Sequence, residues 1–113
     1  NNYSVKISKN TSVDNKKSRL PEKIELLTNS PNPFNPETRI AYRLPEAMNI
    51  SLEIYNLNGK LIRSLVNGRK AGGFHTHLWK GRNNQGQRVN SGIYFYRLMA
   101  KGQVFTRKMI LIK

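Results

Sequence analysis

The chain has 113 residues, no cysteine and a formal net charge of +14. This length allows one domain with a modest core and a tail, and the lack of cysteine excludes disulfides, cysteine catalysis and thiolate metal sites. The longest aliphatic run, Met109 to Ile112, is far too short to span a membrane, and the first residues show no signal-peptide pattern.

The positive charge is concentrated in the second half of the chain. All six carboxylates precede residue 54, whereas residues 54–113 contain twelve Lys or Arg and no acid. Such a basic surface favours anionic partners, for example nucleic acid, acidic polysaccharide or lipopolysaccharide, but it also simply keeps a domain soluble. The sequence leaves both interpretations open.

The first 23 residues are expected to lie outside the folded domain. Residues 1–8 alternate between polar and apolar side chains, which predicts a half-buried strand that either ends a preceding domain or forms an arm. Residues 9–23 contain few apolar side chains and predict a solvated linker that proteases can reach. We therefore expect the domain to comprise residues 24–113.

About seven short strands are expected in that domain, separated by turn residues and without a helix-period segment. Asn58-Gly59 predicts a type I′ hairpin turn, and Asn67-Gly68 is expected to end the strand that follows it. This pattern predicts an all-β, immunoglobulin-like antiparallel sandwich with its first and last strands near sheet edges. The expected strand ranges are 24–28, 38–44, 49–55, 60–66, 74–80, 93–100 and 104–112.

The segment from Ser30 to Pro36 contains three prolines. Each proline fixes its φ angle and lacks an amide donor, so the segment can form neither a helix nor a central strand. We expect it to lie beside an edge strand with Phe34 pointing inward. A P-x-x-P ligand motif from Pro33 to Pro36 is the alternative.

The residues give little support for catalysis or for cofactor binding. The carboxylates are scattered, and His75 and His77 lie on one face of a strand without a third metal ligand nearby in sequence. The simpler interpretation is one buried imidazole and one at an edge. The aromatic and basic run from Tyr94 to Arg97 could stack on nucleic acid, but period-2 alternation directs Tyr94 and Tyr96 into a core. Nucleic-acid binding is therefore not expected.

Several motifs, taken in order, resemble a known family. They are Ser30 to Pro36, Ile50 to Tyr55 with Asn58-Gly59-Lys60, Trp79 with Gly81 and Gly86, Ser91 to Leu98, and Arg107 to Lys113. Together they resemble the C-terminal sorting domain, type A, of cargo proteins of the type IX secretion system. That family is similar in fold to the immunoglobulin-like domain of flagellar hook-capping proteins. The resemblance covers about residues 24–113.

The resemblance implies a non-catalytic address label on a larger exported protein. The family's partners are an upstream passenger domain, the outer-membrane translocon that recognises the label, and a sorting protease that often removes it, after which anionic lipopolysaccharide anchors the passenger. The implied location is secreted or cell-surface, reached through the periplasm and the outer membrane.

The resemblance also assigns residues. The structural motif falls on Pro31, Asn32, Pro33, Phe34, Gly59, Trp79, Gly81, Gly86, Gly92 and Tyr94, and translocon recognition on Lys108, Met109, Ile110, Leu111, Ile112 and Lys113. Two positions depart from the family: Lys80 stands where it commonly has Asp, and His77 where it has an aliphatic residue. Because Lys80 removes a carboxylate, no ion site is carried over. We expect the exposed edge of the C-terminal hairpin to dock by strand addition and charge.

Two other functions remain open. An accessory carbohydrate-binding or adhesive module of a secreted enzyme predicts that Tyr55, Phe74 or Phe105 lie together on one flat surface. A hook-capping structural domain predicts self-assembly or further chain beyond Lys113.

Overall fold

The computed structural model describes residues 20–113. The strand expected in residues 1–8, and most of the linker expected in residues 9–23, lie outside the described residues. Within residues 20–113 there are seven β-strands and no helix that could cross a membrane. The strands are β2 (Glu25–Leu26), β3 (Thr38–Leu44), β4 (Met48–Asn56), β5 (Leu61–Lys70), β6 (Gly73–Trp79), β7 (Gly92–Ala100) and β8 (Gln103–Leu111).

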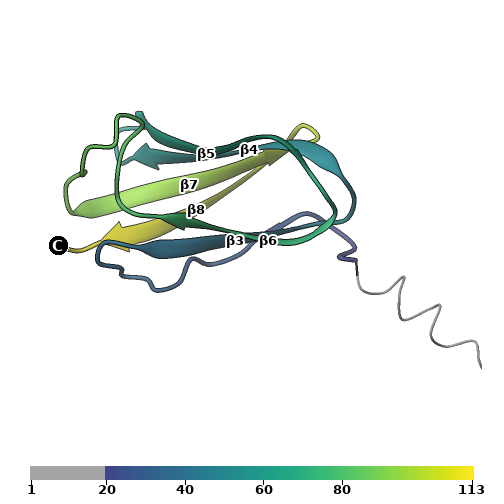
Figure 1. Cartoon of the computed structure of the whole chain (residues 1–113), viewed down its shortest axis with the longest axis horizontal. Helices are drawn as coiled ribbons and strands as arrows, with labels where there is room; N and C mark the ends of the chain where they lie inside the picture. The colour runs from purple at the N-terminus through teal and green to yellow at the C-terminus, as the bar shows by residue number, and fades with distance from the viewer. Residues whose placement is uncertain (1–19) are drawn as a thin grey trace, which may run out of the picture.

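These strands form two antiparallel sheets that pack face to face (Figure 1). One sheet has the order β2-β3-β6 and the other has the order β5-β4-β7-β8. The predicted all-β sandwich is therefore confirmed. Strands β2 and β8 are the sheet edges on one flank, where they contact each other, and β5 and β6 are the edges on the opposite flank.

The core is built from alternate residues of the strands, because successive side chains of a strand point to opposite faces. On β3, Ile40, Tyr42 and Leu44 are fully buried, whereas Arg39 and Arg43 are exposed on the outer face. The core side chains of the other sheet come from β4, β5, β7 and β8 in the same way. Burial of these side chains from both inner faces provides the main stabilisation of the sandwich.

Strand β7 decides between the two interpretations of the aromatic and basic run. Tyr94, Tyr96 and Leu98 are buried in the core, with relative exposures of 6%, 0% and 0%. Phe95 and Arg97 lie on the outer face and are only partly exposed. The expectation that alternation directs these tyrosines into the core is confirmed, so they cannot form a stacking platform at the surface.

The two tight turns differ from the prediction. The hairpin between β4 and β5 forms, but its turn is not type I′, because Gly59 (φ +85°) has a positive φ and Asn58 does not. The Gly59 amide donates to the Asn56 carbonyl over 3.0 Å, which gives a longer loop closed by a left-handed glycine. The turn with positive φ at both central residues joins β7 to β8, at Lys101 (49°) and Gly102 (74°).

Strand β5 is longer than expected. Asn67-Gly68 does not end it, because Asn67 pairs with Ser51 and Gly68 pairs with Ile50, and the strand continues to Lys70. The ladder offered by β4 outweighs the local preference of the Asn-Gly pair for a turn. Tertiary pairing has overridden turn chemistry here.

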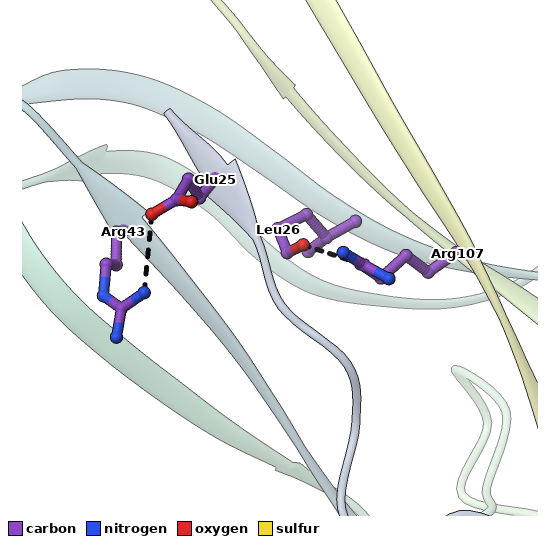
Figure 2. A network of polar contacts seen from close by, with 4 residues as sticks. All are labelled: Glu25, Leu26, Arg43 and Arg107. Atoms are coloured by element: carbon purple, nitrogen blue, oxygen red, sulfur yellow. Dashed lines mark hydrogen bonds and ion pairs between the residues drawn. The ribbon is translucent and has the colours of Figure 1, made fainter. Parts of the chain in front are cut away.

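Strand β2 has only two residues and is held from both sides (Figure 2). Arg43 of β3 makes a 3.4 Å ion pair with Glu25, and Arg107 Nε of β8 donates a 2.7 Å hydrogen bond to the Leu26 carbonyl. The ion pair is exposed, and such pairs contribute about 0–1 kcal/mol. The Arg107 contact links the two sheets across the β2–β8 flank.

Candidate interaction site at the C-terminal strand

Three aromatic side chains pack beneath the end of β8. The ring centroids of Phe34 and Trp79 are 5.7 Å apart, and those of Trp79 and Tyr94 are 5.5 Å apart in an edge-to-face arrangement. All three are buried in the same core as Met109 and Leu111. Such aromatic pairs contribute about 0.5–1.5 kcal/mol each beyond the burial of their surface. The motif aromatics therefore form the base on which the C-terminal strand rests.

The loop after Trp79 is fitted closely to this base. Trp79 Nε1 donates a 2.9 Å hydrogen bond to the Arg82 carbonyl, which satisfies the buried indole. Gly81 has a φ of +70°, and a Cβ atom there would lie 3.2 Å from the Pro36 carbonyl oxygen. Glycine is needed here both for the left-handed backbone and for the close approach of residues 36 and 81. Of the other motif glycines, Gly86 lies in the same loop, Gly92 is the first residue of β7, and Gly59 lies in the turn between β4 and β5.

The proline-containing segment is bound to the edge of β8. The Phe34 amide donates to the Ile110 carbonyl (3.0 Å), and the Ile112 amide donates to the Phe34 carbonyl (2.8 Å). The Ile110 amide donates to Asn32 Oδ1 over 3.0 Å. The expectation that this segment lies beside an edge strand with Phe34 inward is confirmed, since Phe34 is 1% exposed.

A buried polar pair fixes the start of the same segment. Asn29 Nδ2 donates to Thr38 Oγ1 over 3.0 Å, and Thr38 Oγ1 donates to the Pro31 carbonyl over 2.8 Å. Asn29 and Thr38 are 5% and 1% exposed, so their polar groups need these partners. Pro31 and Pro33 themselves are exposed. Asn29 and Thr38 therefore hold the Pro31 carbonyl and so position Asn32 and Phe34 for the contacts with β8.

The exposed edge expected on the C-terminal hairpin is present along only part of β8. Ile110 and Ile112 direct their backbone groups away from β7 and bond them to Asn32 and Phe34. By the alternation of an antiparallel ladder, residues 104, 106 and 108 point their backbone groups the same way. Within residues 20–113 no further strand pairs there. The open part of the edge is thus a stretch of about five residues, 104 to 108.

The six residues expected to mediate recognition divide into two sets. Met109 and Leu111 are 0% and 2% exposed and belong to the core. The others have exposed side chains; they are Lys108, Ile110, Ile112 and Lys113. Only this second set can contact a partner while the domain stays folded.

The exposed set is part of a larger surface, which we name the β8 strip. It comprises the outward-facing residues Val104, Thr106, Lys108, Ile110 and Ile112, and the neighbouring β7 residues Ile93 and Phe95. Val104 and Ile112 are 57% and 47% exposed, and Ile93 and Ile110 are both 37% exposed. The strip therefore combines a row of apolar side chains, one lysine and an open backbone edge.

Arg107 has a role that the sequence interpretation missed. It lies between Phe105 and Met109 on the core-facing side of β8, as period 2 requires. Its position could have been recognised from the sequence, because a charged residue on the core-facing side of a strand must extend to the sheet edge to find a polar partner. In the structure that partner is the Leu26 carbonyl.

The two histidines lie on the same side of edge strand β6 and stack on Tyr42, with centroids 5.2 and 5.5 Å away. Both are half-buried, so the expected division into one buried and one edge imidazole is wrong. His77 Nε2 lies 3.0 Å from the Tyr42 hydroxyl. Burial, then the charges of Lys70 and His75, lower the pKa of His77. In the part of the chain described, no group of three His, Asp or Glu could hold a metal ion.

The aromatic residues that a flat carbohydrate platform would need lie on three different sides. Tyr55 lies on the outer face of the four-stranded sheet, where Arg97 covers its ring at 4.4 Å. Phe74 is exposed on the outer face of the other sheet, opposite Arg43. Phe105 lines the groove between β2 and β8. They do not form the coplanar surface that a carbohydrate-binding function predicts.

The sequence profile of the FlgD Ig-like domain matches residues 29–103, which are 75 of the 113 residues. The chain belongs to the family of FlgD Ig-like domains. In this FlgD Ig-like domain the matched region ends where β8 begins, so the β8 strip lies mainly beyond it. No curated protein sequence matches the chain.

Solved structures with the same immunoglobulin-like fold include three from two organisms. Dimeric latent PorU from Porphyromonas gingivalis has a TM-score of 0.64 and 22% identity, over 79% of this chain and 9% of PorU. PorZ, an essential surface component of the type IX secretion system of that organism, has a TM-score of 0.54 and 20% identity, over 76% of this chain and 11% of PorZ. FlgD from Pseudomonas aeruginosa has a TM-score of 0.53 and 16% identity, over 81% of this chain and 68% of FlgD. At these identities the likeness shows the fold alone.

Proposed function

We propose that this FlgD Ig-like domain is a non-catalytic sorting module of a larger exported protein, recognised through the β8 strip by the outer-membrane translocon of the type IX secretion system. The partners in this proposal are an upstream passenger, the translocon, a sorting protease and an anionic lipopolysaccharide. The proposal places the mature protein outside the cell or on its surface. The fold shared with PorZ, a surface component of that system, supports it.

The observation that carries the proposal is the open edge of β8 beside exposed apolar side chains. Unpaired strand edges attract further strands, and folded proteins usually cover or blunt them. Here the edge is covered at Ile110 and Ile112 but open from residue 104 to 108, next to Val104 at 57% exposure. A receptor segment can add to this edge through backbone hydrogen bonds and read the outer side chains for specificity.

The charge around the β8 strip favours a receptor segment that carries acidic groups. Lys108 and Lys113 are exposed, and within residues 54–113 there is no acid that could neutralise them nearby in sequence. Cationic groups at the rim of an interface raise the rate of association with an acidic partner. We therefore infer a receptor segment with apolar residues and carboxylates.

Deletion of residues 108–113 cannot test this proposal, because it removes the core residues Met109 and Leu111. The better experiment fuses the full chain to a fluorescent passenger in a host with a type IX system. In one variant, Lys108→Glu, Ile110→Ser and Lys113→Glu change only exposed side chains. Secretion of the passenger should fall by about tenfold, which corresponds to the loss of roughly 1.4 kcal/mol of binding free energy.

A second variant tests strand addition separately. Thr106→Pro removes an outward-pointing amide and leaves the ladder to β7 intact, a position where an edge strand tolerates proline.

The matched control for the first variant makes the same three kinds of substitution at exposed residues elsewhere: Lys60→Glu, Leu57→Ser and Arg69→Glu. All variants are checked for the wild-type thermal transition. Normal export of both strip variants, with their folds intact, would overturn the proposal.

A structural role in a surface assembly is the second candidate, and membership of the FlgD Ig-like family favours it. It predicts that the full chain associates with itself. Sedimentation velocity over a wide concentration range distinguishes the two functions, because a sorting module should remain monomeric. Loss of self-association in the strip variant, with normal export, would favour the assembly role.

A further inference from the structure

A hollow of about 350 Å³ lies on the flank opposite the β8 strip, between the edge strands β5 and β6. Its size falls within the usual range of small-molecule sites, about 300–1,000 Å³. Three of its lining residues are cations and none is an acid. The lining residues are Arg63, Leu65, Leu78, Trp79, Lys80, Arg82, Asn83 and Gly86.

The fold places the three cations at this hollow by independent routes. Arg63 pairs in register with the buried Ile54, so its side chain lies on the core-facing side of β5, at the open flank between the sheets. Lys80 directly follows Trp79, the last residue of β6. Arg82 Nη1 donates to the Gly86 carbonyl over 2.8 Å, which holds its guanidinium against the loop.

The loop that closes the hollow is rigidly built. Asn83 Oδ1 accepts hydrogen bonds from the amides of Gln85 (3.0 Å) and Gln87 (2.9 Å). Asn84 ties the loop to β5, because its amide donates to the Ile62 carbonyl (3.0 Å) and its Oδ1 accepts from the Ser64 amide (3.0 Å). A site of this kind is organised before a ligand arrives, which reduces the entropic cost of binding.

The positive charge at the hollow is not neutralised within the described part of the chain. Neither Arg63 nor Lys80 has an ion pair or a side-chain hydrogen bond among residues 20–113, where the ion pairs are Arg43 with Glu25 and Lys101 with Glu46. Segment 60–88, which contains β5, β6 and most of the loop after Trp79, has seven Lys or Arg and no acid. A group of like charges held together without counter-charges produces a focused positive potential.

We propose that this hollow binds the anionic group, a phosphate or a carboxylate, of an acidic sugar. Three cations can each donate charge-assisted hydrogen bonds to the oxyanion. The apolar walls from Leu65 and Leu78 offer a surface for the C–H face of the sugar ring. Nucleic acid fits less well, because Trp79 is 2% exposed and no exposed aromatic ring lines the hollow for base stacking.

The experiment is an amide-resolved NMR titration of the full chain at low salt. Glucose 6-phosphate and galacturonic acid should shift the amides of Arg63 and of residues 78–83. Inorganic phosphate should bind at the same residues but more weakly, and glucose should produce no shift. Arg63→Gln and Lys80→Glu should each weaken binding by about tenfold, because each removes a charged hydrogen-bond donor.

The matched controls separate a built site from general electrostatics. The triple variant Arg63→Gln, Lys80→Gln, Arg82→Gln should lose binding, whereas Lys60→Gln, Arg69→Gln, Arg88→Gln removes the same charge from the same segment, 60–88, and should reduce affinity by less than about threefold. Arg82 also holds the loop, so the double variant Arg63→Gln, Lys80→Gln, which retains Arg82, repeats the test. Equal losses in both triples, or duplex DNA binding more tightly than the acidic sugars at these amides, would overturn the proposal.

The acidic-sugar site is inferred from the β5–β6 flank alone and does not rest on the sorting function; the anionic lipopolysaccharide named there is one source of an acidic sugar. The hollow lies between β5 and β6, whereas the open edge of β8 lies on the opposite flank, so the Thr106→Pro variant should bind acidic sugars normally. Loss of binding in that variant, with its fold intact, would contradict the assignment of the site to the β5–β6 flank.

Discussion

The Phe34 amide donates a 3.0 Å hydrogen bond to the Ile110 carbonyl, across 76 positions of sequence. With the returning bond from the Ile112 amide to the Phe34 carbonyl, it closes the edge of β8 next to the last residues. The Phe34 side chain is buried against Trp79. One residue therefore both anchors the core at this end and limits the open sheet edge to residues 104–108.

Hydrogen exchange should show this division of the edge directly. We expect the Ile110 and Ile112 amides to exchange slowly, because Asn32 Oδ1 and the Phe34 carbonyl accept from them. The outward amides of Thr106 and Lys108 should exchange much faster, since no strand of residues 20–113 pairs with them. Asn32→Ala should speed exchange at Ile110 alone. Uniform protection along β8 would show that the edge is covered.

Phe34→Ala should destabilise the domain strongly. It removes a buried ring from the contact with Trp79 and leaves a cavity, a change that typically costs about 3–5 kcal/mol. Phe74→Ala is the control, because Phe74 is 57% exposed and its truncation should cost less than about 1 kcal/mol. Urea denaturation monitored by tryptophan fluorescence measures both. Equal costs would mean that the Phe34 segment does not support the fold.

Gly81→Ala should cost more than Gly86→Ala. Both residues have left-handed backbones, with φ of +70° and +80°, so each substitution carries a conformational cost of about 1 kcal/mol. At Gly81 the added methyl group would also meet the Pro36 carbonyl at 3.2 Å, whereas at Gly86 nothing lies within 4 Å. Thermal unfolding of the two variants tests this order. The reverse order would show that residues 36 and 81 do not approach closely.

His77 should make stability fall as the pH is lowered below about 6.5. Burial, Lys70 and His75 hold its pKa below the ordinary value of 6.5, so in that range the unfolded chain binds a proton that the folded chain does not. The loss levels off below the lowered pKa, where both states are protonated. His77→Gln removes the titrating imidazole, so the stability of the variant should depend less on pH. The free energy of unfolding is measured by urea denaturation at pH 7 and pH 5. An equal change between the two pH values in wild type and variant would contradict the prediction.

Tyr42 and Tyr96 should destabilise the domain at alkaline pH. Burial raises the pKa of each to about 12, whereas the same groups in the unfolded chain ionise near 10. The unfolded chain therefore loses protons first, and stability should decline as the pH rises from 10 towards 12. Tyr42→Phe removes one of the two contributions. A variant that declines as steeply as the wild type would show that Tyr42 is not protected from solvent.

The strands and the core were predictable because they depend on local alternation. Thr38 to Leu44 was predicted residue for residue, and period 2 directed Tyr94 and Tyr96 into the core. Side-chain direction in a strand follows from backbone geometry alone, and a buried face must be apolar. These two constraints act on neighbouring residues, so a single sequence can reveal them.

The turns were less predictable. Asn58-Gly59 carries the sequence signature of a type I′ turn, yet that geometry is adopted at Lys101-Gly102, where the residues carry a weaker signal. The register of β4 against β5, and that of β7 against β8, decide how many residues each connection contains. Asn67-Gly68 shows the same effect, because pairing with β4 carries β5 through it.

By itself, the sequence determined that the chain is a two-sheet β-sandwich with a basic second half, and which side chains are available to its core. Only the tertiary structure decided which groups meet at the surface: the Asn32 amide oxygen at the Ile110 amide, Arg107 at Leu26, and Arg63 beside Lys80 and Arg82. Alternation is a property of neighbouring residues, whereas these contacts depend on sheet order and register. Sheet order and register are fixed by packing across the whole domain.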